Sequence, residues 1–117
     1  MSQASNYQIF DGTYETLGIK LKDRRSLTVL MLTSPTCVVC KRAKMILPTI
    51  CNENPDVQFL EAGYTDSTKS IFQHFSVQNV PQFFFFKGTE LNGEPKMVTN
   101  LIGFDAKEVR LKITQFI

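Results

Sequence analysis

The feature that most constrains this chain is an apolar run followed, after three residues, by a pair of cysteines. Residues 27–33 read LTVLMLT, which is typical of a strand buried on both faces of a sheet. Ser34-Pro35-Thr36 breaks this strand, and Cys37-Val38-Val39-Cys40 follows. We expect residues 34–36 to supply capping side chains for a helix that begins at Cys37. A buried strand that leads into a helix predicts a sheet covered by helices.

The rest of the chain alternates between strand and helix patterns. Strands are expected near residues 7–10, 57–62, 82–87 and 97–102, and helices near residues 12–21, 66–75 and 105–117, the last one capped by Asp105. This order implies parallel pairing early in the chain and an antiparallel hairpin near its end. The predicted fold class is α/β, with a mixed five-stranded sheet (four strands forming its core) flanked by helices. The length of 117 residues suits one domain, 1–117.

Cys37 and Cys40 are the candidate catalytic residues. Disulfide exchange needs a thiolate nucleophile and a second thiol that can displace the mixed disulfide. The backbone N–H groups and the dipole at the start of a helix favour the thiolate form of Cys37. Cys40 follows three residues later, where the two sulfurs can meet. The spacing therefore indicates thiol–disulfide chemistry.

A zinc site and a pair of inert thiols are the alternatives for these cysteines. Zinc usually takes four Cys or His ligands, and only Cys51 and His74 remain as further soft ligands. Cys51 would lie about 16 Å beyond Cys40 on the same helix, too far for a shared metal site or a disulfide. We expect Cys51 to be a core thiol, His74 a surface residue, and no metal or organic cofactor beside the Cys37–Cys40 redox pair.

Composition narrows the partner classes and the location. The formal net charge is only +2 and the basic residues are dispersed, so neither nucleic acid nor an anionic membrane is an expected partner. No apolar run approaches the roughly 18 residues that span a bilayer, and no signal-peptide pattern is visible. Three cysteines do not make a secreted disulfide framework. These features favour a cytoplasmic protein, which we expect to be a monomer.

The ordered set of motifs resembles the thioredoxin family over almost the whole chain. LTVLMLT with SPTCVVCK resembles the active-site strand, turn and helix of that family. Residues 74–81 with QFFFFKGTE resemble its cis-proline segment and the next strand, and Cys37 and Pro81 are 44 positions apart, as in thioredoxins. Ile102-Gly103-Phe104 resembles the glycine loop beside the substrate groove.

The resemblance implies a thioredoxin fold and a protein-disulfide reductase. Cys37 would be the nucleophile and Cys40 the resolving thiol, with a cis Val80–Pro81 peptide bond beside them. Disulfide-containing proteins would be the substrates, and a flavoprotein disulfide reductase would supply electrons. The substrate-binding residues would be Thr36, Val38, Val39, Val80, Pro81 and Gly103.

Several positions differ from the family pattern. Thr36 replaces a tryptophan, and Val38-Val39 replaces Gly-Pro. Met31 replaces the buried aspartate found six residues before the nucleophile, and we assign Phe59 to the lysine paired with it. Because that pair helps to move a proton from the resolving thiol, Cys40 would rely on water, substrate or another group. We expect slower resolution than in a typical thioredoxin.

Two other functions stay open at this point. Residues 37–44 also resemble the active-site helix of the glutaredoxin family, and residues 79–81 its proline turn. Turnover driven by glutathione alone would favour that alternative. A redox-inactive adaptor with a thioredoxin fold is the other alternative, and it predicts that Cys37→Ser leaves the function intact.

Overall fold

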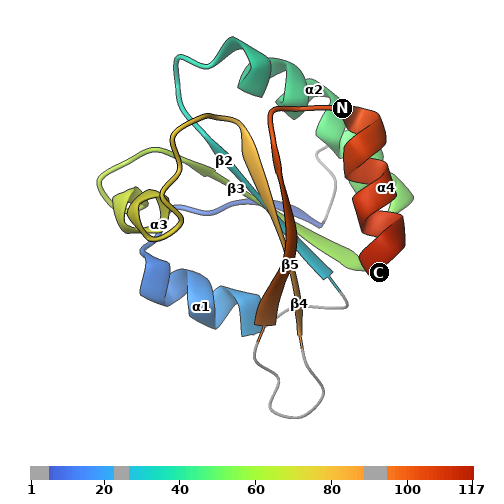
Figure 1. Cartoon of the computed structure of the whole chain (residues 1–117), viewed down its shortest axis with the longest axis horizontal. Coiled ribbons are helices and arrows are strands. Elements are labelled where there is room, and N and C mark those ends of the chain that lie inside the picture. The colour runs from blue at the N-terminus through green and yellow to red at the C-terminus, as the bar shows by residue number, and fades with distance from the viewer. Residues whose placement is uncertain (1–5, 23–26, 89–94) are drawn as a thin grey trace.

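A computed structural model describes residues 6–22, 27–88 and 95–117. These residues form a mixed five-stranded sheet with helices on both faces (Figure 1). The predicted α/β class and the predicted order of elements are confirmed. In chain order the elements are β1 (Tyr7–Ile9), α1 (Tyr14–Lys22), β2 (Leu27–Thr33), α2 (Val38–Glu53), β3 (Val57–Gly63), α3 (Lys69–His74), β4 (Gln82–Gly88), β5 (Pro95–Ile102) and α4 (Ala106–Phe116).

Strand β2 lies at the centre of the sheet, whose strand order is β1-β3-β2-β4-β5. It pairs in parallel with β3 and antiparallel with β4. Every residue of β2 is buried, which explains why its sequence is continuously apolar. β1 pairs in parallel with β3, and β4 pairs antiparallel with β5, so the early parallel pairs and the late hairpin are as predicted.

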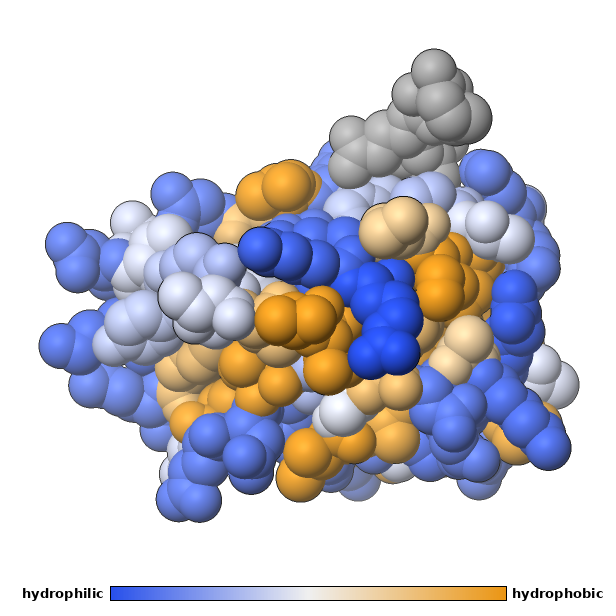
Figure 2. Space-filling view, turned by 90° about the horizontal axis from the view of Figure 1, so that it is seen from above, coloured by the Kyte–Doolittle hydropathy of each residue, from blue (hydrophilic) through white to orange (hydrophobic). Residues whose placement is uncertain are grey.

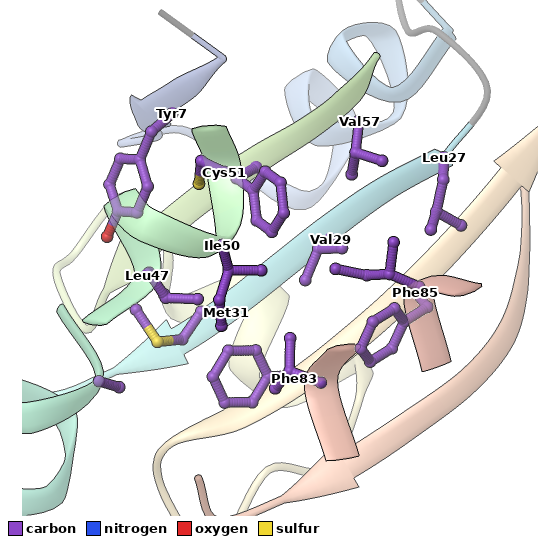
Figure 3. Packing of buried hydrophobic residues seen from close by; sticks show 14 residues of the cluster. Tyr7, Leu27, Val29, Met31, Leu47, Ile50, Cys51, Val57, Phe83 and Phe85 are labelled. Atoms are coloured by element: carbon purple, nitrogen blue, oxygen red, sulfur yellow. The ribbon is translucent and has the colours of Figure 1, made fainter. Parts of the chain in front are cut away.

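Two hydrophobic cores lie on the two faces of the sheet, because successive strand residues point to opposite sides. Helices α2 and α4 cover one face, and α1 and α3 cover the other (Figure 1). Figure 3 shows the first core, in which Val29 and Met31 of β2 pack with Leu47 and Ile50 of α2. In the described ranges, no helix combines the length and the apolar character that crossing a membrane requires.

The helix ends follow from local side-chain hydrogen bonds. Asp105 caps α4 as predicted, because its carboxylate accepts hydrogen bonds from the first-turn N–H groups of that helix. Helix α3 is shorter than the predicted 66–75. The Thr65 N–H donates to the Thr68 hydroxyl oxygen at 2.8 Å, and that hydroxyl donates to the Gly63 carbonyl at 2.6 Å. These bonds hold residues 65–68 in a turn, so the helix begins only at Lys69.

Asn6 joins three segments beside the first core. Its side chain is buried, and its Nδ2 atom donates to the carbonyl oxygens of Cys51, Asn54 and Val57 at 3.1, 2.9 and 2.8 Å. The Asn6 carbonyl accepts from the Phe59 N–H at 2.8 Å. One residue therefore fixes the start of β1 against the end of α2 and the start of β3.

Candidate active site

Cys37 lies at the N-cap position of α2, where the chain leaves the central strand. Its backbone is extended (φ −87°, ψ 112°), and its Sγ accepts a hydrogen bond from the Cys40 N–H at 3.0 Å. The cysteine itself therefore caps the helix, and the expectation that residues 34–36 supply the cap is wrong. A sulfur at this position faces the positive end of the helix dipole, which favours its thiolate form.

Cys37 and Cys40 form a disulfide, with Cα atoms 5.2 Å apart. The two cysteines differ in exposure: Cys37 is half-buried, whereas Cys40 is completely buried. Of the two residues, only Cys37 has surface through which an incoming molecule could approach the disulfide.

Two other segments meet Cys37. The carbonyl oxygen of Val80 lies 3.5 Å from its Sγ, and the Val80–Pro81 peptide bond is cis. The Pro81 carbonyl accepts a hydrogen bond of 2.8 Å from the Gly103 N–H. Gly103 has φ +86°, a backbone conformation that favours glycine. The structure thus brings together residues from three distant parts of the sequence.

The other predicted substrate-binding residues vary in exposure. Thr36 is exposed, and 74% of the Val38 surface is accessible. Val39 and Val80 are half-buried, and Pro81 is buried. Figure 2 views the molecule from the side on which α2 lies uppermost in Figure 1, and it shows apolar surface interrupted by hydrophilic residues.

Sequence reasoning missed a buried polar cluster beneath α2. Glu61 of β3 is buried; its carboxylate accepts a hydrogen bond from the Tyr7 hydroxyl and forms a 3.0 Å ion pair with Lys44 of α2. The register places Glu61, not Phe59, opposite Met31, whereas Phe59 lies opposite Val29.

The assignment of Phe59 as the partner of Met31 is therefore wrong, because the register between β2 and β3 cannot be inferred from the sequence of either strand. A signal for Glu61 was nevertheless present in the sequence. Val57, Phe59 and Glu61 alternate along one face of β3, so the third of them is a charge at an inward-facing position.

Burial also affects two groups near this cluster. The pKa of the Tyr7 hydroxyl is raised above its usual range, first by burial and then by its hydrogen bond to Glu61. Burial raises the pKa of the Cys51 thiol to about 12. Both groups are therefore neutral near pH 7.

The remaining candidate ligands lie apart from the cysteine pair. Cys51 is a buried free thiol inside α2, as predicted. His74 is exposed, as predicted, and its ring stacks on Tyr14 at a centroid distance of 3.8 Å. Among residues 6–22, 27–88 and 95–117, no three His, Cys, Asp or Glu side chains gather as a metal site would require.

The fold and the disulfide at the start of α2 define a thioredoxin-like protein and support a thiol–disulfide oxidoreductase in general terms. Comparison with solved structures agrees. The chain is similar to Trichomonas vaginalis thioredoxin, with 27% identity, a TM-score of 0.87 and coverage of 96% of this chain and 98% of that one. The resemblance to the thioredoxin family and the thioredoxin fold are therefore confirmed.

Other thioredoxins are similar to the chain at lower identity and support the fold alone. Nicotiana alata thioredoxin NaTrxh shares 23% identity at a TM-score of 0.80, with 99% of this chain and 96% of that chain covered. Fasciola hepatica thioredoxin shares 22% identity at a TM-score of 0.79, with 94% and 99% covered. No protein-family model matches the sequence, and no curated protein matches it.

Proposed function

We propose that this protein reduces disulfide bonds of other proteins, with Cys37 as the nucleophile and Cys40 as the resolving thiol. The observation that carries the proposal is the unequal exposure of two disulfide-bonded cysteines at the start of one helix. Only Cys37 has surface open to a substrate, whereas the buried Cys40 is positioned to react with its neighbour. This asymmetry suits a two-step exchange.

In the first step, the Cys37 thiolate attacks one sulfur of the substrate disulfide. The substrate S–S bond breaks, and the displaced sulfur leaves as a thiolate that takes a proton from water. The Cys40 N–H, 3.0 Å from the Cys37 sulfur, favours the thiolate form from which the attack begins.

In the second step, Cys40 gives its proton to water, and the resulting thiolate attacks the Cys37 sulfur. The mixed disulfide breaks, the second substrate sulfur leaves as a thiolate and is protonated, and the Cys37–Cys40 disulfide forms. Two electrons have then passed from the protein dithiol to the substrate, which ends as two thiols. A reductant must return two electrons to the protein, and the family resemblance suggests a flavoprotein disulfide reductase.

Substrate recognition in this proposal uses the surface around Cys37. Val38 supplies exposed apolar area, and Thr36 and Val39 lie beside it in sequence. An extended substrate segment would lie along the backbone of Val80–Pro81 and Gly103. Apolar contact and backbone pairing depend little on the sequence of the substrate segment, so many disulfide-containing segments would be accepted.

Reduction of insulin disulfides by dithiothreitol tests the proposal. Wild type and Cys51→Ala should both accelerate the reaction, and Cys37→Ser should not. Cys40→Ser should accumulate a mixed disulfide on Cys37, visible by mass spectrometry. If the wild type does not exceed the uncatalysed rate, the reductase proposal fails and the adaptor alternative replaces it. Turnover with glutathione as the only reductant would instead indicate a glutaredoxin-like activity.

A further inference from the structure

Glu61 is the one charged residue that is buried among the described residues. Its side chain is 9% exposed and that of its partner Lys44 is 39% exposed. An isolated buried carboxylate would be strongly destabilising. The hydrogen bond from Tyr7 and the ion pair with Lys44 satisfy this one. The three residues come from β1, β3 and α2, so the cluster ties two strands of the sheet to the helix that carries the cysteines.

Lys44, one partner of the ion pair, lies one helical turn from the resolving cysteine. Lys44 follows Cys40 by four residues on α2, which places their Cβ atoms about 5–6 Å apart on the same side of the helix. Glu61 lies opposite Met31, and Met31 is buried in the core beneath α2 (Figure 3). Because Cys40 is completely buried, nearby charges act on it with little screening by solvent.

We propose that the Lys44–Glu61 ion pair, held in place by Tyr7, sets the proton affinity of the Cys40 thiol. The inference rests on the proposed function, in which Cys40 must lose its proton before the second exchange step. Lys44 and Glu61 act through their charges and are positioning residues for Cys40. Lys44 favours the Cys40 thiolate and Glu61 opposes it, so the balance between them determines how readily the mixed disulfide is resolved.

The other ionisable groups around Cys40 leave this balance in place. In the core beneath α2, the titratable members are Tyr7 and Cys51, and the raised pKa of each keeps it neutral. Cys37 carries no charge while it is bonded to substrate. Lys41 and Arg42 are exposed on α2, where solvent screens them. On α4 and the loop before it, the charged groups are Asp105, Lys107, Glu108, Arg110 and Lys112, all at the surface or half-buried.

Removing either charge should therefore shift Cys40 in opposite directions. Glu61→Gln leaves the Lys44 ammonium uncompensated, so the pKa of Cys40 should fall. Lys44→Gln leaves the Glu61 carboxylate uncompensated, so the pKa of Cys40 should rise. We expect shifts of about half a unit to one unit for a single charge at this range. At position 61, glutamine keeps the shape of glutamate and can still accept the hydrogen bond from Tyr7. At position 44, glutamine removes the charge and is one atom shorter than lysine.

The test follows single-turnover reaction of the reduced protein with one equivalent of 5,5′-dithiobis(2-nitrobenzoate). Attack by Cys37 releases a first coloured thiolate, and attack by Cys40 on the mixed disulfide releases a second. The rate of the second phase against pH gives the apparent pKa of Cys40. All variants carry Cys51→Ala, which leaves two reactive thiols, and Glu53→Gln is the matched control because Glu53 lies on α2 in an exposed ion pair with Arg110.

The expected result is a lower second-phase midpoint for Glu61→Gln, a higher one for Lys44→Gln, and no shift for Glu53→Gln. Shifts in the same direction, or unmoved midpoints with a normal first phase, would overturn the inference and leave the reductase proposal standing. A wild type without a first phase would refute the proposed function and the inference with it. If Glu61→Gln fails to fold by circular dichroism, the more exposed Lys44→Gln decides the question alone.

Discussion

Replacing Asn6 should weaken the junction between β1, the end of α2 and the start of β3. Its amide group reaches the carbonyl oxygens of Cys51, Asn54 and Val57. Asn6→Ala removes both N–H donors from this buried site. A buried hydrogen bond contributes about 0.5–1.5 kcal/mol net, so two of them correspond to a loss of roughly 1–3 kcal/mol in the free energy of unfolding.

Asn6→Asp should be more damaging, although it changes only one atom of the side chain. It places a carboxylate against carbonyl oxygens without a donor between them, and an unpaired buried charge costs about 3–5 kcal/mol. The folded state would prefer the protonated form, so the folded-state pKa of the new carboxyl would lie above its unfolded value of about 3.9. The variant should therefore lose stability as the pH rises from about 4 towards 7.

Urea denaturation at pH 4 and pH 7 measures both effects. We expect wild type and Asn6→Ala to differ by a similar amount at the two pH values, and Asn6→Asp to fall further below Asn6→Ala only at pH 7. Equal stabilities of Asn6→Asp and Asn6→Ala at both pH values would refute this reasoning. So would a loss below about 0.5 kcal/mol for Asn6→Ala, since the amide would then contribute less than one hydrogen bond.

Three further predictions concern single positions. Gly103→Ala should lower the free energy of unfolding by about 1–2 kcal/mol, because an L side chain is strained at φ +86°. No neighbour lies within 4 Å of the new methyl group to add a steric clash, and an unchanged urea midpoint would contradict this prediction. Tyr7→Phe should cost about 1.5–3 kcal/mol, the contribution of a hydrogen bond to a charged acceptor, and a variant as stable as wild type in urea would argue against that bond. Burial raises the pKa of Cys51 to about 12, so iodoacetamide at pH 8 should alkylate it only after unfolding, as mass spectrometry of native and denatured samples would reveal.

The sequence was informative wherever the signal is local. The continuous apolar run of β2 matched its complete burial, and Asp105 capped α4 at the expected residue. The Cys-x-x-Cys spacing after a buried strand predicts a reactive cysteine pair, and the structure shows the two cysteines joined in a disulfide. In each case, the chemistry of a few consecutive residues decides the local structure.

The sequence was less informative where two segments must be aligned in space. The pairing of Met31 with Glu61 depends on the register of β2 and β3. Phe59 lies two residues away on the same face of β3, so the alternation of side chains alone does not distinguish it from Glu61. The ion pair with Lys44 depends further on how α2 lies over the sheet. Side-chain hydrogen bonds that compete with helix formation are also difficult to predict from sequence. At the start of α3, the Thr68 hydroxyl donates to the Gly63 carbonyl and holds the preceding residues in a turn.

The central position of β2 has a consequence for local opening. Strands β3 and β4 form hydrogen bonds to the two edges of β2, and the two hydrophobic cores cover its two faces. Amides in such a strand exchange with solvent only through the largest opening of the protein. Only residues 34–36 separate this strand from Cys37, so the reactive sulfur lies close in sequence to the most protected element. In increasing denaturant, we expect catalytic activity and the hydrogen-exchange protection of the slowest β2 amides to be lost at the same midpoint.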